Sequence, residues 1–215
     1  MTQSDRRQVS ALIYQQHRLQ LGTWSLRCPG FPHVSLCQYI MGYEGLPVLL
    51  LAEIAEHSQH LSADARCSFL VAAADPSLQA PRVTWLAEAL RLPEAQIPGN
   101  AWRYYQYFPE MQGYHASLNF HFWMLRPLQG RWIGGFGRAL WLDWQVLDGV
   151  PAVAREQSYL ERWGGLSTPW GQLVGVDPWG MDFSADALHR HQFLQPATTV
   201  AALEQALEIF FAENS

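Results

Sequence analysis

Apolar and polar side chains alternate along several short stretches of this chain, and the alternation predicts β-strands. It is clearest at residues 118–124, where apolar residues take every second position and Asn119 and His121 lie between them. A period of two places successive side chains on opposite faces of a sheet. Strands are predicted at residues 21–27, 33–41, 47–51, 67–73, 81–90, 118–124 and 131–141, with a turn at Gln129–Gly130 before the last.

Between these strands, amphipathic stretches predict helices. The expected helical ranges are 9–20, 52–62, 93–107, 152–163 and 199–212, and a short strand is expected at 173–176 before an Asp-Pro-Trp-Gly turn. Several antiparallel strands with two or three helical connections favour a barrel. The change of character near Val150 indicates a small second α/β unit, so we predict domains over residues 1–148 and 149–215.

The composition is rich in aromatic and poor in charged residues. Hydrophobic residues make up 49% of the 215 positions and charged residues 15%, with 10 Trp, 8 Tyr and 10 Phe. Large contiguous apolar surface is uncommon on monomers. We therefore expect a homodimer or a large aromatic cleft.

The charge of the chain restricts its partners. The formal net charge is −5, and all 14 basic residues are arginine. Without a basic cluster the chain is not expected to bind nucleic acid, whose recognition depends on Lys and Arg. The lack of lysine excludes Schiff-base chemistry and a P-loop, so any anion site must use Arg, His or backbone amides.

The chain shows no targeting or membrane segment. Its first ten residues are polar, and its longest apolar run, residues 46–52, is too short to span a bilayer. A cytoplasmic protein without membrane contact is expected. Cys28, Cys37 and Cys67 lack metal-ligand spacing, so reduced structural thiols are expected, although Cys28 and Cys37 could face each other across a hairpin.

Residues 57–71 predict a corner where a short helix ends and an apolar strand begins. Free backbone N–H groups and the Ser58 hydroxyl could bind a phosphate there. His57 and His60 could also donate to an anion when protonated, but most of that charge is absent at neutral pH. The alternative is an ordinary connection between two elements.

Three motifs resemble the pyridoxamine-5'-phosphate-oxidase-related FMN-binding split-barrel family, in particular its HugZ-like haem-utilisation branch. The first is Pro-His-Val-Ser-Leu at residues 32–36, which includes Ser35, and the second is the segment 57–71. The third is Gly-Gly-Phe-Gly-Arg-Ala at residues 134–139, expected in a strand. The Val-Asp-x-x-Gly-x-Asp turn at residues 176–182 is similar to the branch's C-terminal extension.

The resemblance implies an α+β fold: a six-stranded antiparallel split β-barrel with a small C-terminal α/β extension. It also implies a homodimer with FMN at the subunit interface. The implied cofactor contacts are Ser35, His57, Ser58, Gln59 and Arg138. Gln59 stands where an Arg or Lys usually grips the phosphate, and Arg27, Arg66 and Arg82 are further candidate cations.

The branch also implies haem as an alternative ligand, held by a histidine. His189 and His191 are the candidate iron ligands, with Arg190 beside them for a propionate and His17 as an outside candidate. An exposed polar loop is the alternative interpretation of this stretch. We assign no catalytic residue, because no base lies at a spacing that singles out an acid or a nucleophile.

The sequence therefore favours an FMN-binding, oxidoreductase-like protein of this class, with a role in haem utilisation or degradation. The alternatives are a haem-binding carrier, or a cofactor-free dimeric split-barrel protein that has lost FMN. Either would explain the missing cation at Gln59.

Overall fold

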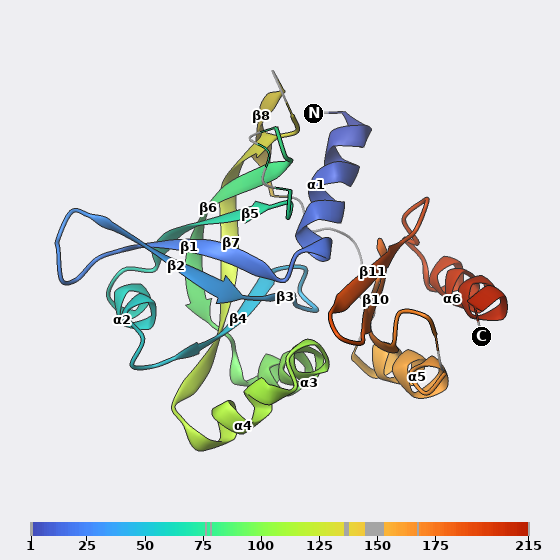
Figure 1. Ribbon diagram of the computed structural model, residues 1–215. Helices are drawn as coiled ribbons and strands as arrows, with labels where there is room; N and C mark the ends of the chain where they lie inside the picture. Colours follow the sequence, from blue (N-terminus) through green and yellow to red (C-terminus); the bar gives the residue numbers. More distant parts are fainter. Residues whose placement is uncertain are drawn as a thin grey trace.

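A computed structural model of the chain describes residues 2–75, 77, 79–135, 138–144, 153–166 and 168–214. Two antiparallel sheets organise these residues: a large curled sheet, and a three-stranded sheet near the C-terminus (Figure 1). The small sheet lies beside α1 and α3, whereas α2 lies on the other side of the large sheet (Figure 1). The predicted boundary at residues 148 and 149 lies outside the described residues.

The large sheet contains eight strands in the described part of the chain, in the order β2-β1-β5-β6-β7-β4-β3 with β8 against β7. Its elements are α1 (Gln3–Gln15), β1 (Arg18–Trp24), β2 (Pro32–Gln38), β3 (Ile40–Met41), β4 (Pro47–Ala52), α2 (Glu56–Ala63), β5 (Arg66–Ala72), β6 (Arg82–Arg91), η1 (Glu94–Gln96), α3 (Ile97–Tyr107), α4 (Glu110–Ser117), β7 (Phe120–Ile133) and β8 (Ala139–Asp143). The longer strands β1, β2, β4, β5, β6 and β7 form the predicted six-stranded antiparallel split barrel. The predicted α+β fold is confirmed.

Alternation along the strands directs one set of side chains into the barrel. In β1, for example, Leu19 and Leu21 are buried and Arg18 and Gln20 are exposed. The interior cluster combines apolar side chains of the strands with those of α1. β4 is buried along almost its whole length, because its other face packs under α3 in a second cluster with Tyr104. Burial on both faces explains the continuous apolar run at residues 46–52.

The C-terminal unit forms a sheet in the order β11-β10-β9. Its elements are α5 (Val153–Trp163), β9 (Gln172–Asp177), β10 (Gly180–Ser184), β11 (Leu188–Gln192) and α6 (Val200–Asn214). One face of the sheet packs against α5 and α6 through its own core cluster. The other face meets the barrel unit, where Val174 and Leu188 pack in the cluster under α3. Strands β10 and β11 were not among the elements predicted from the sequence.

The predicted turn at Gln129–Gly130 is wrong. β7 continues through these residues and pairs with β6 along its length, so that Gly130 lies opposite Trp85. A Cβ atom at residue 130 would lie 2.6 Å from the Trp85 ring. Glycine at this position therefore allows the buried Trp85 ring to pack closely against the strand. The turn comes later, where the Gly134 amide donates to the Arg138 carbonyl and Gly135 has a φ of +124°.

Two other predictions need correction. The first helix spans Gln3–Gln15 rather than 9–20, because a capping box between Thr2 and Asp5 sets its start. Alternation then begins at Arg18, so β1 starts three residues before the predicted strand. The exit from the helix expected at Pro109 agrees with α3, which ends at Tyr107, and a further helix, α4, begins at Glu110. No helix in the described residues is long and apolar enough to cross a membrane.

Candidate functional site

The large sheet leaves a gap between its two edges, and a cavity lies there. β2 is one edge and β4 with β3 is the other; β2 and β4 lie close together without pairing in the described residues. The cavity, which we call the seam cavity, has a volume of about 470 Å³. Its lining comes from both edges, from the start of α2 and from β7: Arg18, Leu36, Cys37, Gln38, Leu50, Leu51, Ala52, Ala55, His57 and Phe120.

His57 and Ser35 meet beside this cavity. His57 is in the first turn of α2, Ser35 is on β2, and Nδ1 of His57 lies 3.2 Å from the Ser35 hydroxyl. Burial lowers the pKa of His57, and the neighbouring His33 and His60 lower it further. His57 is therefore a neutral hydrogen-bonding group near pH 7. The structure brings together two of the residues that the family resemblance implied.

Two further histidines, His33 and His60, lie in the same part of the barrel. Nδ1 of His60 lies 2.9 Å from the Thr23 hydroxyl, inside the core. The rings of His33 and His60 are 5.2 Å apart in an edge-to-face arrangement, and Nδ1 of His33 lies 3.7 Å from Glu56. His60 is thus held inside the fold and does not line the seam cavity. Its position contradicts the expected contact between His60 and an external anion.

Ser58 and Gln59 differ in what they offer a ligand. Ser58 is 1% exposed, and its hydroxyl has no hydrogen-bond partner. Gln59 is exposed, and its side-chain amide donates to the Ile54 carbonyl at 3.2 Å. α2 begins at Glu56 without a side-chain cap. The Ser58 amide donates to the Ala55 carbonyl at 3.0 Å, which leaves the amides of Glu56 and His57 as donors for an anion.

One cation that lines the seam cavity was not among the residues that the sequence indicated. Arg18, at the start of β1 opposite Gln38, lines the seam cavity. By contrast, Arg66 is paired with Asp64 at 2.6 Å, and Arg138 is paired with Asp5 at 2.7 Å. The pair with Asp5 holds Arg138 at α1, and α1 and α2 lie on opposite sides of the large sheet (Figure 1). The contact of Arg138 with a cofactor stays a prediction. Arg18 is connected with this site only through the pairing of β1 with β2, which joins residues that are far apart in the sequence.

The candidate iron ligands lie on a strand, β11, and not in the exposed loop of the alternative interpretation. His189 and His191 pair with Phe183 and Met181 of β10 and share one face of the strand. His189 is exposed, whereas the His191 ring packs 4.6 Å from the Phe210 ring. Burial lowers the pKa of His191, and the adjacent Arg190 lowers it further. Both imidazoles remain candidates for a metal, with His189 the more accessible.

Arg190 does not accompany these histidines. It points to the opposite face of β11, where its guanidinium binds Asp182 and Asp177 at 2.7–2.9 Å and its side chain is buried. The suggested contact between Arg190 and a haem propionate is therefore wrong, because the carboxylates of Asp182 and Asp177 already bind the Arg190 guanidinium. In the described residues, no group of three or more His, Cys, Asp or Glu side chains is arranged to bind a metal ion by itself.

The hairpin of β1 and β2 carries exposed apolar side chains next to the seam cavity. Val34 is 65% and Leu36 64% exposed, and Trp24 and Phe31 are also exposed. A second, more apolar cavity of about 440 Å³ lies where Trp24 faces Leu86 and Leu128. An apolar face of this kind suits a partner or a planar ligand.

Solved structures share this arrangement of elements. The protein Atu2129 from Agrobacterium tumefaciens, of unknown function, has a TM-score of 0.76 at 20% identity, covering 95% of this chain and 94% of that chain. A heme binding protein from Mycobacterium smegmatis has a TM-score of 0.58 at 21% identity, covering 97% and 95%. ChuZ from Campylobacter jejuni has a TM-score of 0.57 at 15% identity, covering 66% and 61%.

These comparisons define the class of the fold. The resemblance to the split-barrel class that the motifs indicated is confirmed at the level of structure. No protein-family model and no curated protein matches the sequence. At these identities the similarity establishes the fold, and the chemistry has to be argued from the residues of this chain.

Proposed function

We propose that this protein is a homodimeric split-barrel protein that binds a planar redox cofactor at the seam cavity, and that haem fits this site best. The observation that carries the proposal is an open cavity of about 470 Å³ at the start of α2, lined by Arg18 and His57. The protein from Mycobacterium smegmatis, which has a similar fold over 97% of this chain, is a heme binding protein.

The positions of the two candidate binding groups support the proposed dimer. α2 lies on one side of the barrel and β11 on the other (Figure 1). Residues of α2 and β11 from one chain therefore cannot contact the same ligand. A second copy docked on the exposed Val34 and Leu36 of β2 would cover apolar surface and supply His189 or His191 to the corner. The division into domains 1–148 and 149–215 and a cytoplasmic location remain parts of this proposal.

Haem suits the chemistry of these groups. Its ring needs apolar contacts, its iron takes a neutral imidazole, and its propionates pair with arginine. The β1–β2 hairpin offers the apolar face, β11 offers the histidines, and Arg18 is a cation at the cavity. Bound haem would supply the redox chemistry, while the chain orients it and limits access of water.

FMN is the second candidate, and the corner itself favours it. The Ser35–His57 pair beside the cavity and the uncapped start of α2 are groups that can hold a phosphate. Against FMN, neutral His57 and exposed Gln59 add no positive charge for a dianion. In this alternative the chain is an FMN-dependent oxidoreductase-like protein.

The test is an absorbance titration of the purified protein with haem and, separately, with FMN. We expect saturable haem binding with a Soret band that shifts in His189→Ala and more weakly in His191→Ala. His115→Ala is the matched control, because His115 is engaged by Tyr105 on a different part of the surface. Saturable binding of FMN without haem binding would replace the first candidate by the second, and no binding of either would leave a cofactor-free protein.

A second measurement separates an enzyme from a carrier. Haem-loaded protein would be given a reductant in air and its Soret band followed over time. Steady loss of the band with release of iron supports haem degradation. A stable band supports storage or delivery of haem.

A further inference from the structure

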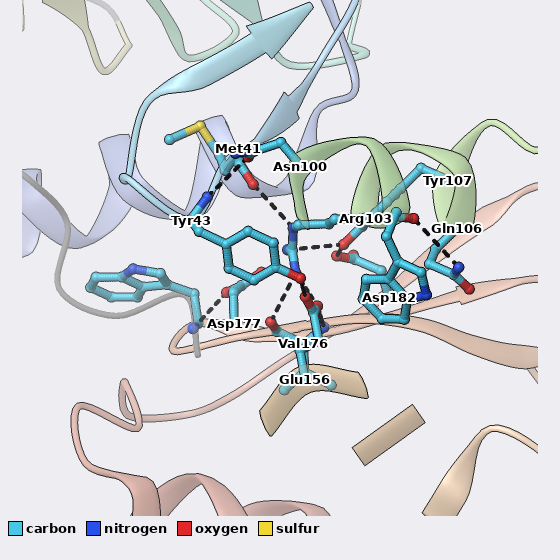
Figure 2. A network of polar contacts seen from close by, with 12 residues as sticks. Met41, Tyr43, Asn100, Arg103, Gln106, Tyr107, Glu156, Val176, Asp177 and Asp182 are labelled. Atoms are coloured by element: carbon cyan, nitrogen blue, oxygen red, sulfur yellow. Dashed lines mark hydrogen bonds and ion pairs between the residues drawn. The ribbon is translucent and has the colours of Figure 1, made fainter. Parts of the chain in front are cut away.

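A network of buried charges lies where the barrel unit meets the C-terminal unit, outside the seam cavity (Figure 2). In its first half, Arg103 of α3 pairs with Glu156 of α5 and donates to the Met41 carbonyl at 3.0 Å. Glu156 also accepts from the Tyr43 hydroxyl at 2.6 Å and from the Val176 amide at 3.0 Å. Both ends of this ion pair therefore have further hydrogen-bond partners.

The second half of the network holds β11. Arg190 binds both oxygens of Asp182 on β10, at 2.9 and 2.8 Å, and Oδ1 of Asp177 at the end of β9, at 2.7 Å. Tyr107 of α3 links the halves, since its hydroxyl donates to Asp182 at 2.8 Å and lies 3.3 Å from the Arg103 guanidinium. The network thus connects α3 with all three strands of the small sheet.

This network explains the residue types of the Val-Asp-x-x-Gly-x-Asp turn, which does not line the seam cavity. Its two aspartates are Asp177 and Asp182, the partners of Arg190. Its glycine allows close approach, because a Cβ on Gly180 would lie 2.3 Å from the His191 carbonyl. Just before the turn, a Cβ on Gly175 would lie 1.8 Å from the Tyr107 hydroxyl, so glycine there lets α3 dock on β9.

We propose that this junction network locks the C-terminal unit onto the barrel in one orientation, and that Arg103 and Arg190 are positioning residues for the histidines of β11. The second part rests on the proposed function, because it assumes that these histidines bind the cofactor. Arg190 faces the barrel while His189 and His191 face away from it, so holding the arginine fixes the direction of both imidazoles.

Apolar packing alone would not define this orientation. Val174 and Leu188 pack under α3, but contacts between apolar side chains are non-directional. A buried guanidinium that has to satisfy two carboxylates accepts few geometries, and one misplaced charge in the interior is costly. Setting the register of packed elements is the best-supported role of buried polar groups.

The experiment compares three variants of the whole chain. The double variant Arg103→Met/Glu156→Gln removes both charges of one pair. It leaves no unpaired buried charge, so the variant should still fold. Arg190→Lys keeps the charge but loses the planar fork that bridges Asp177 and Asp182. Arg162→Met/Glu208→Gln is the matched control, since this pair joins α5 to α6 on the exposed surface.

Hydrogen–deuterium exchange of the cofactor-free proteins tests the lock. We expect the amides of α3 and of β9–β11 to exchange at least about tenfold faster in both network variants, while the interior strands of the barrel keep their protection. The control should match the wild type throughout. Wild-type exchange rates in α3 and β9–β11 of both network variants would overturn the lock.

Haem titration then tests positioning separately. In the network variants we expect a changed Soret position and an affinity lowered about 10- to 100-fold, the usual cost of losing a group that orients a ligand. Faster exchange with unchanged haem spectrum and affinity would overturn the positioning role and leave the lock. If the wild type binds no haem, the proposed function and the positioning role both fail, and the exchange data still decide the lock.

Discussion

Arg103 and Glu156, which are 53 residues apart in the chain, form an ion pair whose side chains are only 2% and 0% exposed. Glu156 uses both oxygens, with Val176 and Tyr43 as its further donors. A pair of this kind contributes little net stability relative to an apolar pair, but loss of one partner leaves a buried charge without compensation. The contact between the two units therefore depends on having both residues.

Arg103→Met should lower the free energy of unfolding by about 3–5 kcal/mol, because the buried Glu156 would lose its charged partner. Arg162→Met, which removes an exposed pair with Glu208, should change it by about 1 kcal/mol or less. Urea denaturation followed by fluorescence measures both values. Equal effects of the two substitutions would contradict the assigned importance of the buried pair.

Stability should fall as the pH falls from about 6.5 towards 5, where histidines of the unfolded chain become protonated. Burial lowers the pKa of His17, and Arg190 and Arg103 lower it further against the opposing effect of Asp182. The folded state therefore binds fewer protons than the unfolded state in this range, so unfolding free energy rises with pH. His17→Gln should reduce that slope, by at most about 1.4 kcal/mol per pH unit. Urea denaturation at several pH values tests this, and an unchanged slope would argue against it.

Gly130→Ala should destabilise the barrel by about 1–3 kcal/mol, because the new methyl group would meet the ring of the buried Trp85. Gly113→Ala is a suitable control, since a Cβ there meets nothing within 4 Å and α4 is helical. It should be neutral or slightly stabilising. Thermal unfolding of both variants distinguishes a packed strand at Gly130 from the turn that the sequence predicted.

Gln59→Arg should raise the affinity for FMN, because it adds a cation to α2, two residues after His57. One charge-assisted hydrogen bond is worth about 1.5–3 kcal/mol, so an increase of roughly 10- to 150-fold is expected. Gln112→Arg, on the exposed side of α4, is the control for added charge alone. Fluorescence quenching of FMN measures the binding. No difference between the variants would remove the corner as a phosphate site.

Val34→Asp and Leu36→Asp should shift the protein from dimer to monomer, because a carboxylate would be buried in the proposed apolar interface. Both side chains are exposed on β2. Ile209→Asp, on the exposed face of α6, should leave the assembly unchanged. Sedimentation velocity reports the outcome, and a wild-type monomer at micromolar concentration would remove the dimer from the proposal.

Much of the barrel follows from local pattern. The strand predicted at 47–51 is β4, and the helix predicted at 199–212 is α6 within two residues at each end. Both residues of the His57–Ser35 pair could also be predicted from the sequence, since both lie in motifs that resemble the family. By contrast, Gly130 was taken for a turn because glycine is common in turns, and nothing local indicates that the Trp85 ring lies against it.

By itself, the sequence placed the corner at the end of the helix, whereas the seam cavity lies at the start of α2. It determined the positions of most strands and of that helix. These depend on side-chain periodicity and on residues a few positions apart. Only the tertiary structure decided that Arg18 reaches the seam cavity, that Asp5 captures Arg138, and that Arg190 turns towards Asp177 and Asp182 instead of a ligand. The physical reason is that a charged side chain selects its partner by distance and burial in three dimensions, and neither is encoded in the neighbouring residues.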